Sequence, residues 1–167
     1  MRMRLAVGLC LVTALISVTA STAAAASPPP TRPTPVVLDD CTITIVGQRS
    51  TGELITTSPR CFATQAEAQR QSAAALANVV AIHYKQTNYN GPSLTVNGNS
   101  CTGGYINLQG ALASWRNSIV STRNVLCPVT RHWSGFNKTG AVDVHHAWEV
   151  NLGSLVGATS SASYHNS

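Results

Sequence analysis

The feature of this sequence that most constrains its fold is an internal duplication in the C-terminal half. In each copy, six residues separate an aromatic residue from a glycine, an Asn-Leu pair follows, and a serine closes the unit. The landmarks are Tyr84, Gly91, Asn107, Leu108 and Ser121 in the first copy, and Trp133, Gly140, Asn151, Leu152 and Ser163 in the second. Because sequence repeats usually fold as structural repeats, the duplication predicts two related structural units.

Short apolar segments separated by Gly, Asn, Ser and Pro continue from Val79 to the end of the chain. Strand-like segments lie at 79–84, 93–96, 105–108, 119–120 and 141–144. Short strands at regular spacing, with turn residues between them, are typical of a β-sandwich or barrel. We therefore predict a mainly β fold for this half of the chain.

In these landmarks the sequence resembles the βγ-crystallin superfamily, whose unit is a four-stranded Greek key. The resemblance implies a two-unit Greek-key sandwich over 79–167, with units at about 79–125 and 126–167. In such a unit the first hairpin folds back over its sheet, glycine supplies the positive φ, and the serine hydroxyl hydrogen-bonds the folded hairpin. Gly91 to Ser121 is 30 residues and Gly140 to Ser163 is 23, so the first unit carries seven more. An unrelated small sandwich is the alternative.

The N-terminal residues read as an export signal. Arg2 and Arg4 precede an apolar run from Leu5 to Val18, and small residues at 23–26 offer a cleavage site, which predicts a signal peptide over 1–26. The apolar run is too short for a membrane-spanning helix. Residues 27–40 are rich in proline and predict a flexible lead-in. We therefore expect a secreted, extracellular protein, and the alanine-rich signal suits an actinobacterial source.

Cysteine usage agrees with export. One of the five cysteines, Cys10, lies in the predicted signal, and an even number remains: Cys41, Cys61, Cys101 and Cys127. In an exported chain this predicts two disulfides. Three pairings are possible. We favour Cys41–Cys61 and Cys101–Cys127, because each closes a loop of 20 or 26 residues within one segment.

The segment 41–78 predicts two strands and a helix. Residues 42–46 alternate polar and apolar side chains, and 53–57 can return as a second strand. Thr64 and Glu67 have the spacing of a capping box, and a run rich in Ala and Gln continues to about Asn78. We predict a small ββα layer attached to the main domain and tied by Cys41–Cys61.

Calcium is the first ligand to consider, because many βγ-crystallin units bind it through the pattern Asn/Asp-Asn/Asp-x-x-Ser/Thr-Ser. The matching segments are 116–121 and 158–163. The pattern fails at Arg116 and Val120 in the first and at Ala158 and Ala162 in the second. Calcium takes roughly six to eight oxygen ligands, usually with carboxylates, and neither segment contains one. We expect no metal or cofactor, with calcium disfavoured.

Other chemistry has little support. His145 and Glu149 would share a face only on a helix, whereas the sequence reads as strand, so we predict a surface pair of His145 and His146 beside Trp148. No His-Glu-x-x-His motif and no Gly-x-Ser-x-Gly elbow is present. Without Arg2 and Arg4, nine of the eleven basic residues remain against six acidic ones, and they are scattered. We therefore predict no catalytic residues and no nucleic-acid partner.

The resemblance implies a secreted, non-enzymatic binding protein. Among secreted bacterial proteins with two such units and two disulfides, the chain is similar to the small metalloproteinase inhibitors of actinobacteria. The implied partner is an extracellular protein, a metalloprotease in the first instance, bound by a monomer that has no membrane segment after signal cleavage. Two alternatives remain, an exported toxin-like or antimicrobial βγ-crystallin-fold protein and a structural cell-envelope protein.

Overall fold

The computed structural model describes residues 37–74, 78–99, 101–146 and 151–167. The predicted signal peptide, most of the lead-in, and Trp148 and Glu149 lie outside the described residues. Within them, no helix is long and apolar enough to cross a membrane. The elements in chain order are β1 (Asp40–Gln48), β2 (Leu54–Thr56), β3 (Arg60–Phe62), α1 (Gln65–Ala74), β4 (Val79–Tyr84), β5 (Ser93–Asn97), β6 (Thr102–Asn107), η1 (Gly110–Trp115), β7 (Ser121–Asn124), β8 (Val129–Trp133), η2 (Phe136–Lys138), β9 (Val142–His146) and β10 (Ser161–His165).

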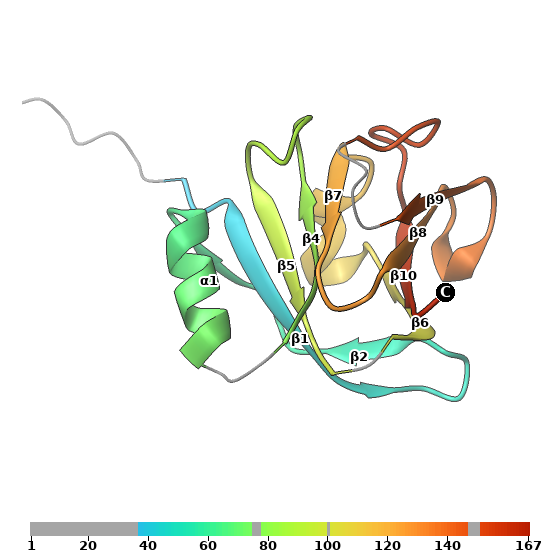
Figure 1. Cartoon of the computed structure of the whole chain (residues 1–167), viewed down its shortest axis with the longest axis horizontal. Coiled ribbons are helices and arrows are strands. Elements are labelled where there is room, and N and C mark those ends of the chain that lie inside the picture. Colours follow the sequence, from blue (N-terminus) through green and yellow to red (C-terminus); the bar gives the residue numbers. More distant parts are fainter. Residues whose placement is uncertain (1–36, 75–77, 100, 147–150) are drawn as a thin grey trace, which may run out of the picture. The chain divides into compact units, whose positions relative to one another are not determined.

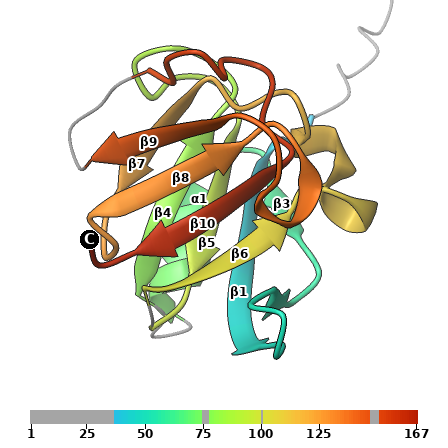
Figure 2. The same cartoon turned by 90° about the vertical axis from the view of Figure 1, so that its right-hand side faces the viewer.

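In the described part, the strands form two sheets that face each other (Figures 1 and 2). The first sheet has the order β2-β1-β5-β4-β7, with β3 also paired to β1, and the second has the order β6-β10-β8-β9. Strand β6 comes from the first repeat but lies in the second sheet, beside β10. This crossing of one strand of the first repeat into the second sheet joins the two Greek keys.

The two repeats contact each other through matched hydrogen bonds between the segments that precede β7 and β10. The amide of Asn117 donates to the carbonyl of Thr159 at 2.9 Å, and the amide of Gly157 donates to the carbonyl of Ile119 at 2.9 Å. Each bond is converted into the other when the repeats are exchanged. The repeats are therefore related by a pseudo-twofold axis that passes between these two segments.

The first hairpin of each repeat folds over its sheet and is held by one serine hydroxyl. In the first repeat, Ser121 Oγ donates to the carbonyl of Gln86 at 2.6 Å and accepts from the amide of Tyr89 at 3.2 Å. Tyr89 has a φ of 59° and Gly91 a φ of 73°, so the chain reverses through the left-handed region.

The second repeat uses Ser161 for the same contact. Its Oγ donates to the carbonyl of Gly135 at 2.7 Å and accepts from the amide of Lys138 at 3.2 Å. The spacing of the second repeat predicted this role for Ser163, and the structure corrects it by two residues. Ser163 Oγ instead accepts from Trp133 Nε1 at 3.3 Å. Position and residue type alone could not separate the two serines, because both lie on β10 with one residue between them.

The N-terminal segment extends the first sheet. Strand β1 pairs in parallel with β5, with Thr42 opposite Thr95 and Ile43 opposite Val96. Helix α1 packs on β1 and β5, and Asn97 Nδ2 donates to Ser72 Oγ at 3.1 Å beneath it. The predicted ββα segment is present, and its strands extend the sheet of the first Greek key.

The core lies between the two sheets and is apolar at its centre. Its largest fully buried side chains include Trp115, Leu94, Ile106, Leu108 and Leu152. A second part of the inter-sheet space, toward β7 and β9, is polar and contains histidines.

Candidate functional site

The pseudo-twofold axis brings together the two segments in which a calcium site was considered. By the matched hydrogen bonds, Gly157 and Thr159 are the counterparts of Asn117 and Ile119. The second segment therefore runs over 156–161, two residues earlier than the sequence alignment of 158–163 placed it. In this register the fifth position of the calcium-binding pattern is Ser160, which has the required hydroxyl. The first and second positions, where the pattern has Asn or Asp, are Val156 and Gly157.

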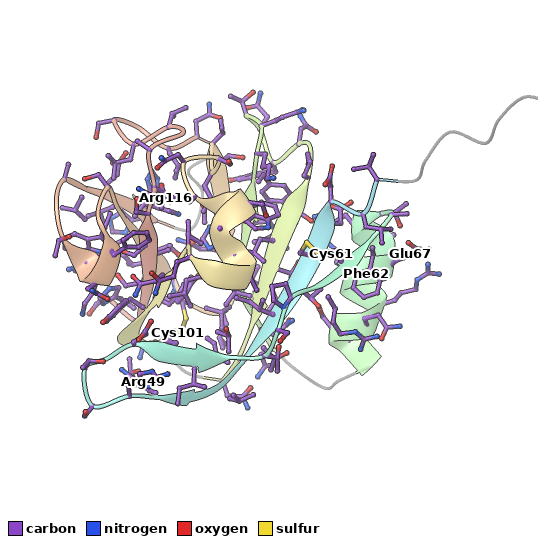
Figure 3. All side chains as sticks on the ribbon, turned by 180° about the vertical axis from the view of Figure 1, so that it is seen from behind. Arg49, Cys61, Phe62, Glu67, Cys101 and Arg116 are labelled. Atoms are coloured by element: carbon purple, nitrogen blue, oxygen red, sulfur yellow. A yellow bond between two sulfur atoms is a disulfide. The ribbon has the colours of Figure 1, made fainter. Side chains whose placement is uncertain are left out.

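The donor set of these segments does not fit calcium. Neither 116–121 nor 156–161 contains Asp or Glu. At the first position stands Arg116, which is labelled in Figure 3. Its guanidinium carbon lies 4.9 Å from the ring centroid of Phe136. A cation at this position repels a second cation, and calcium is usually held with carboxylates. The segments act as the junction of the two repeats.

Three histidines lie in the polar part of the inter-sheet space. His83 of β4 and His132 of β8 are fully buried, and His145 of β9 is 2% exposed. His83 Nδ1 lies 2.9 Å and His132 Nε2 3.1 Å from the Thr122 hydroxyl oxygen. His83 Nε2 lies 2.9 Å from the hydroxyl of Tyr164 on the opposite sheet. The cluster joins the sheets by hydrogen bonds.

Burial keeps the imidazoles of His83 and His132 neutral. Desolvation, with a smaller contribution from His145, lowers the pKa of His83 from 6.5 to about 3. Desolvation and the neighbouring histidines also lower the pKa of His132 well below its usual value. A hydroxyl between two imidazoles has the composition of a nucleophile and base, but a substrate cannot reach a fully buried one. No group of three or more His, Cys, Asp or Glu among the described residues is arranged to hold a metal ion.

The prediction of a surface histidine pair holds for His146 and is wrong for His145. His146 is exposed, whereas His145 points inward. Alternation along a strand places His145 and His146 on opposite faces, but which face is buried depends on the opposite sheet, which periodicity does not reveal.

A groove of about 260 Å³ lies between the β2 segment and η1. Its one charged group, Glu53, accepts a hydrogen bond from Asn107 Nδ2 at 3.0 Å and lies 3.4 Å from Arg49 Nε. Asn107 Nδ2 also donates to Asn137 Oδ1 at 2.8 Å. These polar groups are satisfied within the protein, so the groove offers little to a ligand.

The loop between β7 and β8 has a different character, because it exposes apolar side chains on a fixed backbone. Val125 is 54% and Leu126 40% exposed. The amide of Val125 donates to the carbonyl of Val80 at 3.1 Å, and that of Leu126 to the carbonyl of Val79 at 3.0 Å. We call residues 124–128 the linker loop.

One side chain braces the linker loop from within. Asn124 Nδ2 donates to the carbonyl of Pro128 at 3.1 Å and to the carbonyl of His145 at 2.9 Å. Asn124 Oδ1 accepts from the Thr130 hydroxyl at 2.6 Å. The two ends of the loop are thereby held together and tied to β9.

A disulfide anchors the same loop to the first repeat. Cys127 is fully buried and bonded to Cys101, while Cys41 and Cys61 form the other disulfide between β1 and β3. Cys101 and Cys61 are labelled in Figure 3. Two disulfides indicate an oxidising compartment. Cys127 lies in the linker between the repeats, and the sequence Val-Leu-Cys-Pro in that linker was the available signal for the exposed apolar pair.

No protein-family model and no curated protein matches the sequence. Among solved structures, a betagamma-crystallin domain from Clostridium beijerinckii, crystallised as a double mutant, is 18% identical with a TM-score of 0.42, covering 52% of this chain and 97% of that chain. A betagamma-crystallin domain from Flavobacterium johnsoniae is 24% identical with a TM-score of 0.38, covering 50% of this chain and 91% of that chain. The chain has a βγ-crystallin-like fold. This assignment rests on its two Greek keys and on the pseudo-twofold of their hydrogen bonds.

Proposed function

We propose that this is an exported, non-enzymatic binding protein that inhibits an extracellular metalloproteinase through its linker loop. The observation that carries the proposal is the exposed pair Val125 and Leu126 on a backbone fixed by Asn124 and by the Cys101–Cys127 disulfide. The similarity to actinobacterial metalloproteinase inhibitors, given above on sequence landmarks, supports the choice of partner.

The linker loop is preorganised for binding. An apolar side chain that is already exposed and held in place loses little conformational freedom when it enters a pocket of the partner. Burying one leucine contributes about 2 kcal/mol, and a small number of such anchors dominates most interfaces. A rigid loop also resists the distortion that peptide-bond hydrolysis requires, which favours an inhibitor over a substrate.

The test is a titration of secreted zinc metalloproteinases, with secreted serine proteases as a comparison panel. The mature protein is expected to abolish the activity of at least one metalloproteinase at one-to-one stoichiometry. Leu126→Asp is expected to weaken inhibition by about a hundredfold, because it places a charge in an apolar pocket. Leu38→Asp is the matched control, since Leu38 is 55% exposed outside the loop.

Inhibition of no metalloproteinase in a broad panel would contradict the proposed activity. Equal loss of inhibition in Leu126→Asp and Leu38→Asp, with both variants folded, would retain an inhibitor but remove the linker loop as its binding surface.

A further inference from the structure

The outer face of the second sheet carries apolar side chains that are open to solvent. Val142 of β9 lies opposite Trp133 of β8, and Val144 lies opposite Arg131. Val142 is 43% and Val144 39% exposed, and Trp133 and Arg131 are half-buried. We call these four residues the valine face, and Figure 2 shows the strands that form it toward the viewer.

The pseudo-twofold gives this face a counterpart in the first repeat. Gly91 corresponds to Gly140, so Ser93 corresponds to Val142 and Thr95 to Val144 in the matched strands β5 and β9. Ser93 and Thr95 are polar and yet fully buried. Their strand is flanked by β1 and packed against α1, which come from the N-terminal segment.

The two faces therefore show the reverse of the usual pattern, because the polar face is buried and the apolar face is exposed. In the first repeat hydroxyl side chains are covered, and in the second repeat valines are not covered by any described residue of this chain. A single exposed valine needs no explanation, but two adjacent ones at positions whose counterparts are buried indicate a surface that a partner covers.

Arg131 adds a requirement for charge. Its Nε is buried and has no hydrogen-bond partner among the described residues, and no described carboxylate forms an ion pair with it. Arg131 and Lys138 both act on His165. Burial, and after it the positive charges of Arg131 and Lys138, lower the pKa of His165. No described carboxylate neutralises this half-buried guanidinium, and a partner's carboxylate that reaches its outer nitrogens would bind them bidentately.

We propose that the valine face docks an acidic, apolar segment of a partner protein, with its apolar side chains on Val142 and Val144 and a carboxylate on Arg131. A second copy of this chain is the poorer occupant, because a twofold contact through this face would bring Arg131 and Lys138 of both copies together. The proposal does not depend on the linker loop, which lies in a different segment of the chain.

The probe is an acetylated, amidated five-residue peptide of alternating valine and glutamate. Two control peptides of the same length carry glutamine or lysine in place of each glutamate. Binding is followed by methyl NMR of the mature protein. The glutamate peptide is expected to shift the methyl signals of Val142 and Val144, the glutamine peptide to bind about tenfold more weakly, and the lysine peptide not to bind. Higher salt is expected to weaken binding of the glutamate peptide.

Variants separate the contacts. Arg131→Gln is expected to reduce affinity for the glutamate peptide about tenfold, to the level of the glutamine peptide. Arg123→Gln, an exposed arginine on β7, is the matched control and is expected to bind as the parent does. Val144→Thr reproduces the side chain of Thr95 and is expected to weaken the binding of every peptide that binds the parent.

Leu126→Asp keeps the two proposals distinguishable, because it is expected to bind the glutamate peptide normally. Methyl shifts confined to other residues, or equal binding of the glutamate and lysine peptides, would overturn the proposal. Concentration-dependent dimerisation that Val144→Thr abolishes would also overturn it, in favour of a second copy as the occupant.

Discussion

Acidification is expected to destabilise the protein through the buried histidines well before its carboxylates titrate. Burial lowers the pKa of His83 to about 3 and that of His132 well below 6.5, whereas both return to about 6.5 in the unfolded chain. Below pH 6.5 the unfolded state therefore binds more protons than the folded state. The stabilisation is fully present above pH 6.5 and is lost as the pH falls toward the folded pKa values.

The magnitude follows from the number of protons. Each histidine that stays neutral in the fold costs about 1.4 kcal/mol of stability per pH unit below 6.5. Between pH 6.5 and 5.0, His83 and His132 together are expected to lower the free energy of unfolding by about 3 kcal/mol, because at pH 6.5 each is already half protonated in the unfolded chain. For a chain of this size that corresponds to a fall in Tm of about 12 °C. Aspartates and glutamates titrate mostly below about pH 5, so this window isolates the histidines.

The assay is urea unfolding of the oxidised mature protein at half-unit steps of pH. His83→Gln is expected to reduce the slope of stability against pH by about half. His146→Gln is the matched control, because His146 is exposed on the same strand as His145, and its slope is expected to equal that of the parent. A free energy of unfolding that stays constant from pH 6.5 to 5.0 would show that the buried histidines do not couple folding to protonation, as would an unchanged slope in His83→Gln.

Three further predictions concern the scaffold. Ser161→Ala is expected to cost about 2 kcal/mol, because it removes both hydrogen bonds to the backbone of the folded hairpin. Ser163→Ala is expected to cost less, because its partners Trp133 Nε1 and His165 Nε2 belong to half-buried side chains that water can reach; urea unfolding compares the two variants, and the reverse order would contradict the assignment. Gly91→Ala is expected to cost about 1–2 kcal/mol at its φ of 73°, measured by the shift in Tm, and an unchanged Tm would argue against a left-handed residue there. Replacing Cys101 and Cys127 by alanine is expected to cost about 3 kcal/mol, for a closed loop of 26 residues, and to weaken inhibition more than the same change at the other disulfide.

The repeat predicted the fold because its landmarks are local. A positive φ at glycine and a hydroxyl that bonds the folded hairpin are needed wherever such a hairpin forms, so Gly91 and Gly140 can be recognised without knowing the rest of the structure. The choice between Ser161 and Ser163 depends on which way β10 faces. That direction is set by pairing with β6 and β8, strands from both repeats, and the sequence spacing does not contain it.

The candidate surfaces were less predictable for the same reason. The burial of His83 and His132 comes from the meeting of two sheets, and the exposure of Val142 and Val144 comes from the absence of a described counterpart to α1 over the second sheet. The parallel pairing of β1 with β5 was also missed, because a crossover between distant strands leaves no local pattern in the sequence. Val125 and Leu126 were within reach, since they precede a disulfide cysteine in the linker between two predicted repeats.

Methyl NMR of the protein bound to a metalloproteinase that it inhibits would show directly whether the linker loop is the surface presented to the protease. The methyl signals of Val125 and Leu126 are expected to shift or broaden most, while those of Val37 and Leu38 stay in place. Unperturbed signals from Val125 and Leu126, with the largest changes elsewhere, would contradict this role of the linker loop.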